Sequence, residues 1–350
     1  MTPVPPPGGR DDEAAARLSS MQRNPALEAL LAELNAVLAP ANARLDVDVA
    51  ERLPKVFVVG AMRSGTTLYM QWLASTGLVA YPTNLLSRFH GAPWIGARIQ
   101  QLLTDPAYRF RDEMLGFEAP VDFRSDNGKT TGALAPNEFW YFWRRLLPGL
   151  AEQYQPSDVL RRTSDLGALR EQVDGLANIF GRPFAMKALI LDQNLDLLAE
   201  AFAKPVFAWV RRDPVFNIQS VLAARARQYG TMDRWYSFRI KEFPRLRDLD
   251  PLHAVAGQVY AMNTHVERAL AAMPEHHQLL VDYESFCAAP GAAYDALVAR
   301  LRAHGAAADA PAYAGVEAFA CANEWTLDRY SRREAEAAYA TMRDELGDCA

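Results

Sequence analysis

The stretch Lys55-Val-Phe-Val-Val-Gly-Ala-Met-Arg-Ser-Gly-Thr-Thr67 decides how this chain folds. Its first part, KVFVV, is a short β-branched and aromatic run, which is typical of a buried strand. The run ends at Gly60, and small residues follow as far as Thr67. Apolar spacing then predicts a helix over residues 68–75. The sequence therefore predicts a strand, a glycine-containing loop and a helix in direct succession.

The spacing of the two glycines in this loop is that of a phosphate-binding loop. Gly60 and Gly65 match the glycines of the pattern GxxxxGK[ST], and Thr67 takes the final hydroxyl position. Thr66 stands where that pattern has lysine, and the cation is Arg63, inside the loop. Backbone N–H groups and the N-terminus of the next helix can still hold an anion. The missing lysine disfavours a magnesium-dependent kinase or ATPase, and an ordinary strand-to-helix turn stays open for the motif taken alone.

A second cationic motif follows another predicted strand. The run PVFAWV covers residues 205–210, and Arg212-Asp-Pro comes shortly after it. Ser220 lies eight residues after Arg212 (220 − 212), in the helix predicted next. An arginine at the carboxyl end of a strand can bind a phosphate with two parallel hydrogen bonds, and the serine adds a hydroxyl. Arg211 would take this role if the register of the strand were shifted by one residue.

The two motifs resemble the donor-binding motifs of sulfotransferases that use 3′-phosphoadenosine 5′-phosphosulfate (PAPS). The segment RSGTT (63–67) is similar to the 5′-phosphosulfate loop of bacterial and tyrosylprotein members, with Met62 in place of their proline. The resemblance implies that Arg63 binds the 5′-phosphosulfate and stabilises the transferring group, and that Arg212 and Ser220 bind the 3′-phosphate. It implies a donor-binding role, through amides and hydroxyls, for the other loop residues: Gly60, Ser64, Gly65, Thr66, Thr67 and Leu68.

Two further matches are less specific. Lys187, in the apolar run FAMKALIL (184–191), resembles the lysine that contacts the sulfuryl group in this family. A lysine buried there needs an anionic partner, because an unpaired buried charge costs several kcal/mol. Tyr283, after the run QLLV, resembles the tyrosine that packs near the adenine. A solvent-reaching lysine and a core tyrosine remain the alternatives. The matches lie in order across residues 55–290, so the resemblance covers most of the chain.

The general base is the point at which the chain departs from the family pattern. In-line sulfuryl transfer needs no metal, but the acceptor hydroxyl must lose its proton. Leu189 stands where cytosolic members have histidine, and no carboxylate occupies the position used by tyrosylprotein and carbohydrate-type members. Three candidates remain. Glu138, within the aromatic run APNEFWYFW, ranks first, and His90 ranks second because imidazole titrates near neutral pH. Asp126 is the other candidate, with orientation of the loop Gly128-Lys129-Thr130 as an equal alternative. For each, a loop residue without a catalytic role is the alternative.

Two other groups of polar residues are weaker indications of function. His276 and His277 follow Pro274-Glu275 directly before a predicted strand, where we expect a surface loop. Their spacing is not that of metal ligands. Arg329, Arg332 and Arg333 match a basic C-terminal segment of the family only in location and charge. For that cluster we favour a charged helix start with Ser331 as its N-cap.

Composition restricts the partners of the protein. The 350 residues include 37 Lys and Arg against 42 Asp and Glu, a net charge of −5, so no global field favours nucleic acid or an anionic membrane. The three cysteines are scattered, which predicts neither a disulfide framework nor a zinc site. No apolar run is long enough to span a bilayer and no secretory leader pattern is present. We therefore expect a soluble, cytoplasmic protein without a metal.

The alternation of strands and helices predicts a P-loop-like α/β fold with a doubly wound parallel sheet flanked by helices. Residues 1–20 are expected to form a loose tail and residues 21–350 one domain, with an aromatic-rich, mostly helical insertion at about 80–150. Further strands are predicted over 184–191, 205–210 and 278–281, and helices over 25–45, 160–180, 195–202, 214–226, 252–272, 292–303 and 333–346.

The function that the resemblance implies is transfer of a sulfuryl group from PAPS to a hydroxyl or amine acceptor. The aromatic segment favours a small, partly apolar or lipid-like acceptor. Two alternatives stay open: a P-loop-type nucleotide kinase or NTPase, and a non-catalytic nucleotide-binding protein on the same fold. The sequence does not indicate an oligomeric state.

Overall fold

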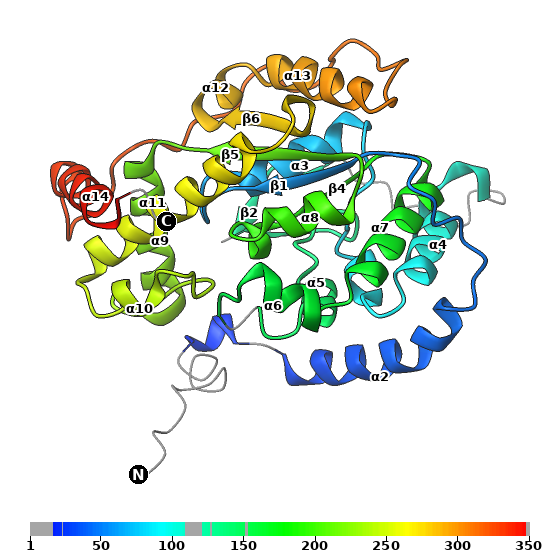
Figure 1. The fold of residues 1–350 in the computed structure, drawn as a ribbon, viewed down its shortest axis with the longest axis horizontal. Coiled ribbons are helices and arrows are strands. Elements are labelled where there is room, and N and C mark those ends of the chain that lie inside the picture. Colours follow the sequence, from blue (N-terminus) through cyan, green and yellow to red (C-terminus); the bar gives the residue numbers. More distant parts are fainter. Residues whose placement is uncertain (1–16, 23, 109–120, 127, 151–152, 348–350) are drawn as a thin grey trace.

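The computed structural model describes residues 17–22, 24–108, 121–126, 128–150 and 153–347 (Figure 1). Within these residues the central sheet has four parallel strands in the spatial order β4-β1-β5-β6. The strands are β1 (Lys55–Val59), β4 (Phe184–Lys187), β5 (Pro205–Arg211) and β6 (Gln278–Asp282). The predicted tail falls mostly on residues 1–16, which lie outside the described residues.

Side chains that alternate along β1 divide the core into two layers. Phe57 and Val59 pack against helices on one face of the sheet, and Val56 and Val58 pack against helices on the other. The first face is covered by α7 (Leu166–Phe180), α8 (Leu195–Ala201) and the C-terminal part of α11 (Pro251–Ala271). The second face is covered by α3 (Thr66–Thr76), α12 (Tyr283–Ala288) and α13 (Pro290–Ala303). The prediction of a doubly wound α/β sheet is therefore confirmed (Figure 1).

The order of the strands fixes where a ligand can bind. The chain passes from β1 to β4 on one side of it, and then to β5 on the other side. In open α/β sheets, ligands bind outside the carboxyl ends of the strands at such a switch point. The loop 60–65 begins at the carboxyl end of β1 and leads into α3, so it lies at this switch point.

A third apolar cluster lies beside the sheet. It joins α11 to α9 (Pro214–Tyr229), α10 (Phe243–Leu246) and α14 (Arg332–Leu346). Pro214 is the first residue of α9, and the side chain of the N-cap residue Asp213 accepts a hydrogen bond from Val215 N. Proline suits the first helical position because its missing N–H has no partner there in any case. The chain therefore turns from β5 into α9 at Asp213-Pro214.

The segment between α3 and α7 consists of short helices joined by turns and irregular chain, so the insertion is less helical than predicted. Residues 109–120, 127 and 151–152 of this segment lie outside the described residues. Its elements are the 3₁₀ turns Leu86–Phe89 and Pro106–Tyr108, α4 (Pro93–Thr104), β2 (Ser125–Asp126), β3 (Lys129–Thr130), α5 (Trp140–Leu146) and α6 (Ser157–Thr163). Phe139, Phe142 and Trp143 are fully buried and belong to the core layer beneath α7. These aromatic side chains are therefore part of the core. The N-terminal helix α2 (Pro25–Asn42) packs against α4.

Two predicted elements differ from the structure. The apolar run 184–191 is not one strand: β4 ends at Lys187, and residues 189–191 form a 3₁₀ turn. Short apolar runs do not distinguish strand from helix. The helix predicted over 160–180 is two helices, because Ser164 ends α6 and the side chain of Asp165 caps α7 by accepting from Ala168 N.

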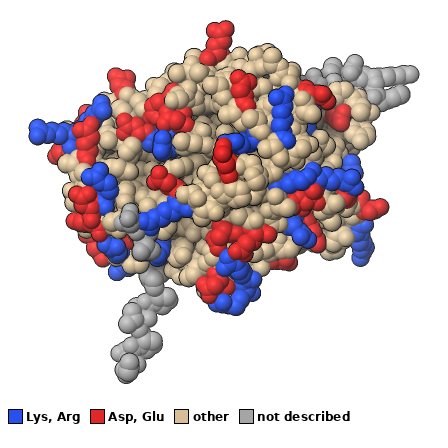
Figure 2. Space-filling view, turned by 45° about the horizontal axis from the view of Figure 1, so that its top comes forward, with Lys and Arg blue, Asp and Glu red and all other residues tan. Residues whose placement is uncertain are grey.

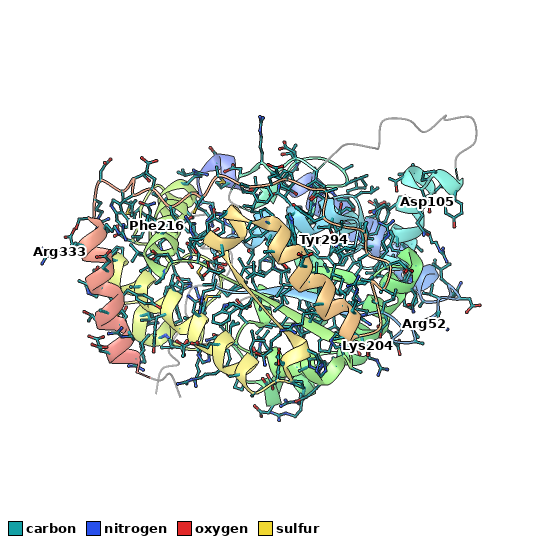
Figure 3. All side chains as sticks on the ribbon, turned by 90° about the horizontal axis from the view of Figure 1, so that it is seen from above. Arg52, Asp105, Lys204, Phe216, Tyr294 and Arg333 are labelled. Carbon is teal, nitrogen blue, oxygen red and sulfur yellow. The ribbon has the colours of Figure 1, made fainter. Side chains whose placement is uncertain are left out.

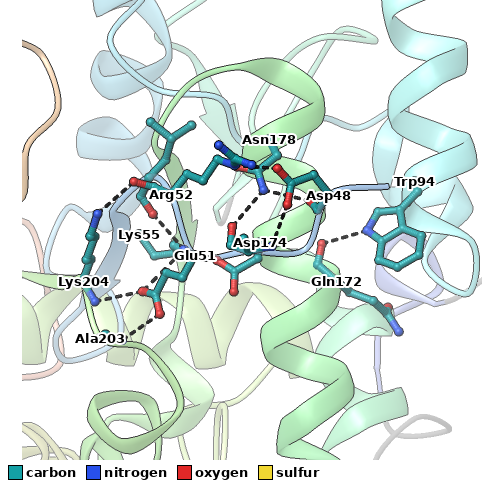
Figure 4. Close-up of polar contacts among 12 residues, drawn as sticks. Asp48, Glu51, Arg52, Lys55, Trp94, Gln172, Asp174, Asn178, Ala203 and Lys204 are labelled. Carbon is teal, nitrogen blue, oxygen red and sulfur yellow. Dashed lines mark hydrogen bonds and ion pairs between the residues drawn. The ribbon is translucent and has the colours of Figure 1, made fainter. Parts of the chain in front are cut away.

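A buried ion pair fixes the start of β1. Lys55 is completely buried, donates from Nζ to the carbonyl of Leu53 at 2.7 Å and forms an ion pair with the buried Asp174 of α7. Glu51 lies 3.5 Å from the same ammonium. Figure 4 shows this cluster at the amino end of the sheet. A buried charge needs such partners, so the pair fixes the position of β1 relative to α7.

Charge is distributed without a dominant sign over the face seen in Figure 2, where Lys and Arg are interspersed with Asp and Glu.

No helix among the described residues is both long and apolar enough to cross a membrane. Cys287 and Cys321 are free thiols.

Candidate active site

The loop after β1 has a backbone that depends on its glycines. Gly60 has a φ of 128° and Gly65 a φ of 100°, both in the region that favours glycine. A Cβ on Gly60 would lie 2.4 Å from the carbonyl oxygen of Val210, and one on Gly65 would lie 2.4 Å from the ring of Tyr283. Thr66 then starts α3, whose first N–H groups have no partner within the helix. The loop therefore brings a helix N-terminus close to β5 and Tyr283.

Arg63 and Ser64 give the loop its polar side chains. Arg63, with a φ of 66°, donates from Nε to Ser220 Oγ of α9 at 3.1 Å. Asn217, one turn earlier in α9, donates to the carbonyl of Met62 at 2.5 Å and ties the loop to that helix. Ser64 is fully buried, and within the described chain its Oγ has no hydrogen-bond partner. The loop thus carries a guanidinium bonded to α9 and a buried hydroxyl without a partner in the described chain, and both groups can bind an anion.

Arg212 lies directly beneath the loop. It is only 7% exposed and donates from Nη1 to the carbonyl of Arg63 at 3.3 Å. Its other nitrogens donate to Asn323 Oδ1, at 2.9 Å from Nε, and to the carbonyl of Ala322. Burial lowers the pKa of the Arg212 guanidinium, and the charges of Tyr283 and other neighbours partly oppose that shift. The guanidinium is thus fixed between the loop and residues 322–323.

Tyr283 completes this side of the site. Its ring centroid is 4.9 Å from the Arg212 guanidinium, and its ring fills the space beside Gly65. The Tyr283 hydroxyl accepts a hydrogen bond from Ala322 N at 3.3 Å, and burial raises its pKa to about 12. Arg211 instead lies over Trp209. The register therefore places Arg212, and not Arg211, at the loop.

Lys187 connects the loop to Glu138. This lysine is the last residue of β4 and is 5% exposed. Its Nζ donates to Thr67 Oγ1 at 2.7 Å and to Glu138 Oε1 at 2.9 Å. Trp140 donates from Nε1 to the other oxygen of Glu138 at 2.5 Å, and Trp143 donates to the carbonyl of Lys187 at 2.9 Å. Both oxygens of the carboxylate are therefore held, one by a cation and one by an indole.

A small cavity lies beside Glu138. Four apolar or aromatic residues line it together with Glu138 and Lys187: Trp140, Trp143, Leu189 and Ile190. Leu189 and Ile190 also line a second small cavity, next to Asp192. Gly128, at the tip of the β2–β3 hairpin, lies close by, because a Cβ there would be 3.5 Å from Glu138 Oε1. The carboxylate thus faces a small, mostly apolar space.

The two other candidate bases lie elsewhere. The ring of His90 stacks on Tyr141 with 5.2 Å between centroids, and burial lowers the pKa of His90 to about 4. Its imidazole is therefore neutral at physiological pH and a poor proton acceptor. Asp126 is exposed on β2 and pairs with Arg227 at 2.9 Å. Neither residue has a described contact with Arg63 or Lys187, so the structure groups only Glu138 with the cations.

The C-terminal arginines do not cover the loop. Arg329 pairs with Asp233 at 3.5 Å, Arg332 pairs with Glu336 at 2.9 Å, and Arg333 lies at the outer edge of the molecule (Figure 3). Ser331 caps α14 with a reciprocal capping box, which confirms the predicted N-cap. The segment that does reach Arg212 is slightly earlier, at residues 322–323.

Sequence reasoning missed three groups near the loop. Asn323 bridges Arg212 and Glu284, donating to Glu284 Oε1 at 2.6 Å. Asp192 accepts a hydrogen bond from Gly60 N at 3.2 Å. Tyr236 lies close enough to Arg63 and Glu138 for their charges to act on its hydroxyl. Burial raises the pKa of Tyr236, the charge of Arg63 lowers it and that of Glu138 raises it. A buried acid at the end of an apolar run was the available signal for Asp192. Nothing in the sequence indicated the other two.

The parallel sheet, the glycine loop after β1 and the cations around that loop define an α/β protein of the P-loop-like class. The model of the sulfotransferase family matches residues 54–304, and the chain belongs to that family. The match includes the loop, Lys187, Arg212 and Tyr283. A comparison with curated proteins gives no match.

Solved sulfotransferases are similar to this chain. One from Mycobacterium tuberculosis H37Rv is 16% identical, with a TM-score of 0.46, over 91% of this chain and 81% of that one. One from Mycobacterium avium is also 16% identical, with a TM-score of 0.45, over 96% and 84%. A sulfotransferase domain from the curacin biosynthetic pathway is 16% identical, with a TM-score of 0.38, over 72% and 75%.

Replacing Gly65 by alanine tests the shape of the loop. The new Cβ would overlap the Tyr283 ring and take a left-handed φ, so we expect a loss of about 2–5 kcal/mol in unfolding free energy. Gly181→Ala is the matched control, because Gly181 has a φ of 63° but nothing within 4 Å of its Cβ position. Urea unfolding measures both. Equal losses in the two variants would mean that Tyr283 does not restrict the loop.

Asp192 makes stability depend on pH. Burial raises its pKa well above the ordinary value of 3.8, while the Gly60 N–H partly opposes the shift. The folded protein therefore keeps this proton at a pH where the unfolded chain has lost it, and stability falls as pH rises above about 4. Asp192→Asn keeps an oxygen for Gly60 N but removes the titration. We expect its unfolding free energy relative to wild type to be greater at pH 8 than at pH 5. An unchanged difference between the two would contradict the buried acid.

Proposed function

We propose that this protein transfers the sulfuryl group of PAPS to a hydroxyl or amine acceptor. The observation that carries the proposal is the contact of Lys187 with both Thr67, in the phosphate-loop motif, and Glu138. It links a donor-binding motif to a carboxylate beside a cavity. A base and a cation at one point are what sulfuryl transfer requires.

The residues around the loop fit an anionic nucleotide. Arg63, Lys187 and Arg212 lie at the ends of β1, β4 and β5, and the Ser64 hydroxyl is buried without a partner among the described atoms. Arg63 with the loop would hold the 5′-phosphosulfate, and Arg212 with Ser220 the 3′-phosphate. PAPS, when bound, supplies a sulfuryl group attached to a phosphate leaving group. This local basic pocket accounts for an anionic donor on a protein of net charge −5.

The reaction that we propose is a single in-line displacement. Glu138 accepts the proton of the acceptor hydroxyl as the new oxygen–sulfur bond forms and the bond between sulfur and the phosphate oxygen breaks. Arg63 and Lys187 offset the negative charge that develops on the leaving phosphate. Trp140 orients the carboxylate through its indole N–H. No step calls for a metal.

The cavity beside Glu138 supports a small acceptor with an apolar body. Trp140, Trp143, Leu189 and Ile190 offer apolar surface, and Glu138 is the carboxylate at its edge. A second small cavity, next to Asp192, shares Leu189 and Ile190 with the first. A phenol or an aliphatic alcohol with a hydrocarbon chain matches this lining, and such acceptors can be screened with radiolabelled PAPS.

Arg212→Ala is expected to weaken binding of 3′-phosphoadenosine 5′-phosphate (PAP) by about 10- to 150-fold, because hydrogen bonds to a charged group contribute about 1.5–3 kcal/mol. Calorimetric titration with PAP measures this. Arg211→Ala is the matched control, since Arg211 points to β6 and lies 3.9 Å from Asp282. An equal or greater loss in Arg211→Ala would show that the site is assigned to the wrong arginine.

A further inference from the structure

Three histidines from two separate elements lie close together at the amino end of the sheet, whereas the phosphate loop lies at its carboxyl end. His276 and His277 end the 3₁₀ turn Glu275–His277, directly before β6, and His304 is the C-cap residue of α13. The ring centroids are 4.4 Å apart for His276 and His277, 5.2 Å for His276 and His304, and 5.3 Å for His277 and His304. One ligand nitrogen from each residue lies within 4.8 Å of the others.

Two ring nitrogens of this cluster have no hydrogen-bond partner within the described chain. His304 is 7% exposed, and its Nε2 is buried with no hydrogen-bond partner in the described part of the chain. The same holds for Nδ1 of His277. The ring of His304 hydrogen-bonds to the backbone of His276. A backbone contact of this kind fixes the ring orientation of a metal-binding histidine and leaves its other nitrogen free.

The charged residues around the three histidines are bound to other groups. Lys204 and Glu51 are the charged groups that act on His304 from the start of β5 and from the segment before β1. The Lys204 ammonium donates to the carbonyl of Arg52 at 3.0 Å, as Figure 4 shows. On the third side, Glu275 pairs with Arg300 at 3.4 Å. The nearby cations are thus held by other partners.

We propose that His276, His277 and His304 bind one divalent transition-metal ion of the zinc class. Neutral imidazole is the commonest ligand for such ions. Metal–nitrogen bonds of about 2.0–2.1 Å require the three nitrogens to draw together to about 3.4 Å from one another in a tetrahedral site. His276 is exposed and has room to turn. The fourth position is open to water.

The site lies away from the sulfuryl-transfer chemistry. The strands are parallel, so the amino end of β6 and the carboxyl end of β1 lie at opposite ends of the sheet. The ion joins the C-terminus of α13 to the start of β6, and therefore stabilises the fold rather than supplying a catalytic group. Spacing along the sequence did not indicate the site, because the third ligand comes from a different helix.

Titration of tag-free, chelator-treated protein with Zn²⁺ at pH 7.5 tests the site. We expect calorimetry to show one ion per chain with a dissociation constant below 10 µM, and thermal unfolding to shift upward with added Zn²⁺. His276→Ala removes an exposed ligand and should weaken binding at least 30-fold, as should His304→Gln. His253→Ala is the control, because His253 is an exposed histidine paired with Asp250 at the start of α11.

The binding and unfolding measurements have one result that supports the metal site and two that reject it. The site is supported if His276→Ala loses both the binding heat and the thermal shift while His253→Ala is unchanged, even if His304→Gln does not fold. Equal Zn²⁺ binding by wild type and His276→Ala, or no binding to wild type at 100 µM Zn²⁺, would overturn the proposal. PAP binding is measured on the same samples, so that a failure of the metal site is distinguished from a failure of the sulfotransferase assignment.

Discussion

Glu138→Gln is expected to lower kcat for sulfuryl transfer by about 100- to 10,000-fold, the usual range for loss of a general base. Glutamine keeps an oxygen for Lys187 and a similar volume beside Trp140 but cannot accept the acceptor's proton. Binding of PAP should change little, since Glu138 contacts the loop only through Lys187. Steady-state turnover with saturating PAPS measures kcat, and calorimetry measures PAP affinity.

The other two candidate bases provide the comparison. We expect His90→Asn and Asp126→Asn to retain kcat within about threefold, because His90 stacks on Tyr141 and Asp126 pairs with Arg227, and neither has a described contact with Arg63 or Lys187. If either lost activity while Glu138→Gln kept it, the base would be misassigned. The ratio of kcat among the three variants therefore decides the role of Glu138.

Lys187→Met is expected to lower kcat by about 100- to 1,000-fold, the range seen when one group that stabilises transition-state charge is removed. The ammonium lies between Thr67 and Glu138, so its loss affects both the leaving phosphate and the position of the base. Methionine fills the buried space left by the aliphatic stem. Rapid-quench measurement of a single turnover isolates the chemical step.

Lys187→Arg is the matched variant, because it keeps the charge. It should recover part of the lost kcat, while PAP affinity changes less than tenfold in either variant. A large loss of PAP affinity in Lys187→Met with kcat unchanged would contradict a role in the chemical step and would leave Lys187 only as a donor-binding residue.

Much of the fold was readable because its signals are local. Apolar runs before Gly60 and before Arg212 predicted β1 and β5, and each phosphate motif followed its strand directly. The run 184–191 was read as one strand because an apolar run carries no mark of where its hydrogen bonds end. The structure ends β4 at Lys187, where the chain turns to bring Asp192 to the loop.

The arrangement of the site was less readable because its contacts are long-range. Glu138 was ranked first from its aromatic neighbours, but its pairing with Lys187 joins segments that no local pattern connects. Asn323 reaches Arg212 from a segment outside the residues that the family model matches. His90 looked suitable from the ordinary pKa of histidine, but burial, together with the charge of Arg145, lowers its pKa. Sequence motifs thus predicted the phosphate-loop side of the candidate site, and the fold was needed to place Glu138 beside Lys187.

Calorimetric titration of the wild-type protein with PAP, with ATP plus Mg²⁺ and 5′-AMP as competitors, distinguishes a PAPS-dependent enzyme from a nucleotide kinase or NTPase. We expect one PAP site of micromolar affinity, at least tenfold weaker binding of 5′-AMP because Arg212 and Ser220 lose the 3′-phosphate, and no phosphoryl transfer from ATP. Absence of PAP binding at millimolar concentration, with tight magnesium-dependent ATP binding in its place, would contradict the PAPS assignment and favour a nucleotide kinase or NTPase.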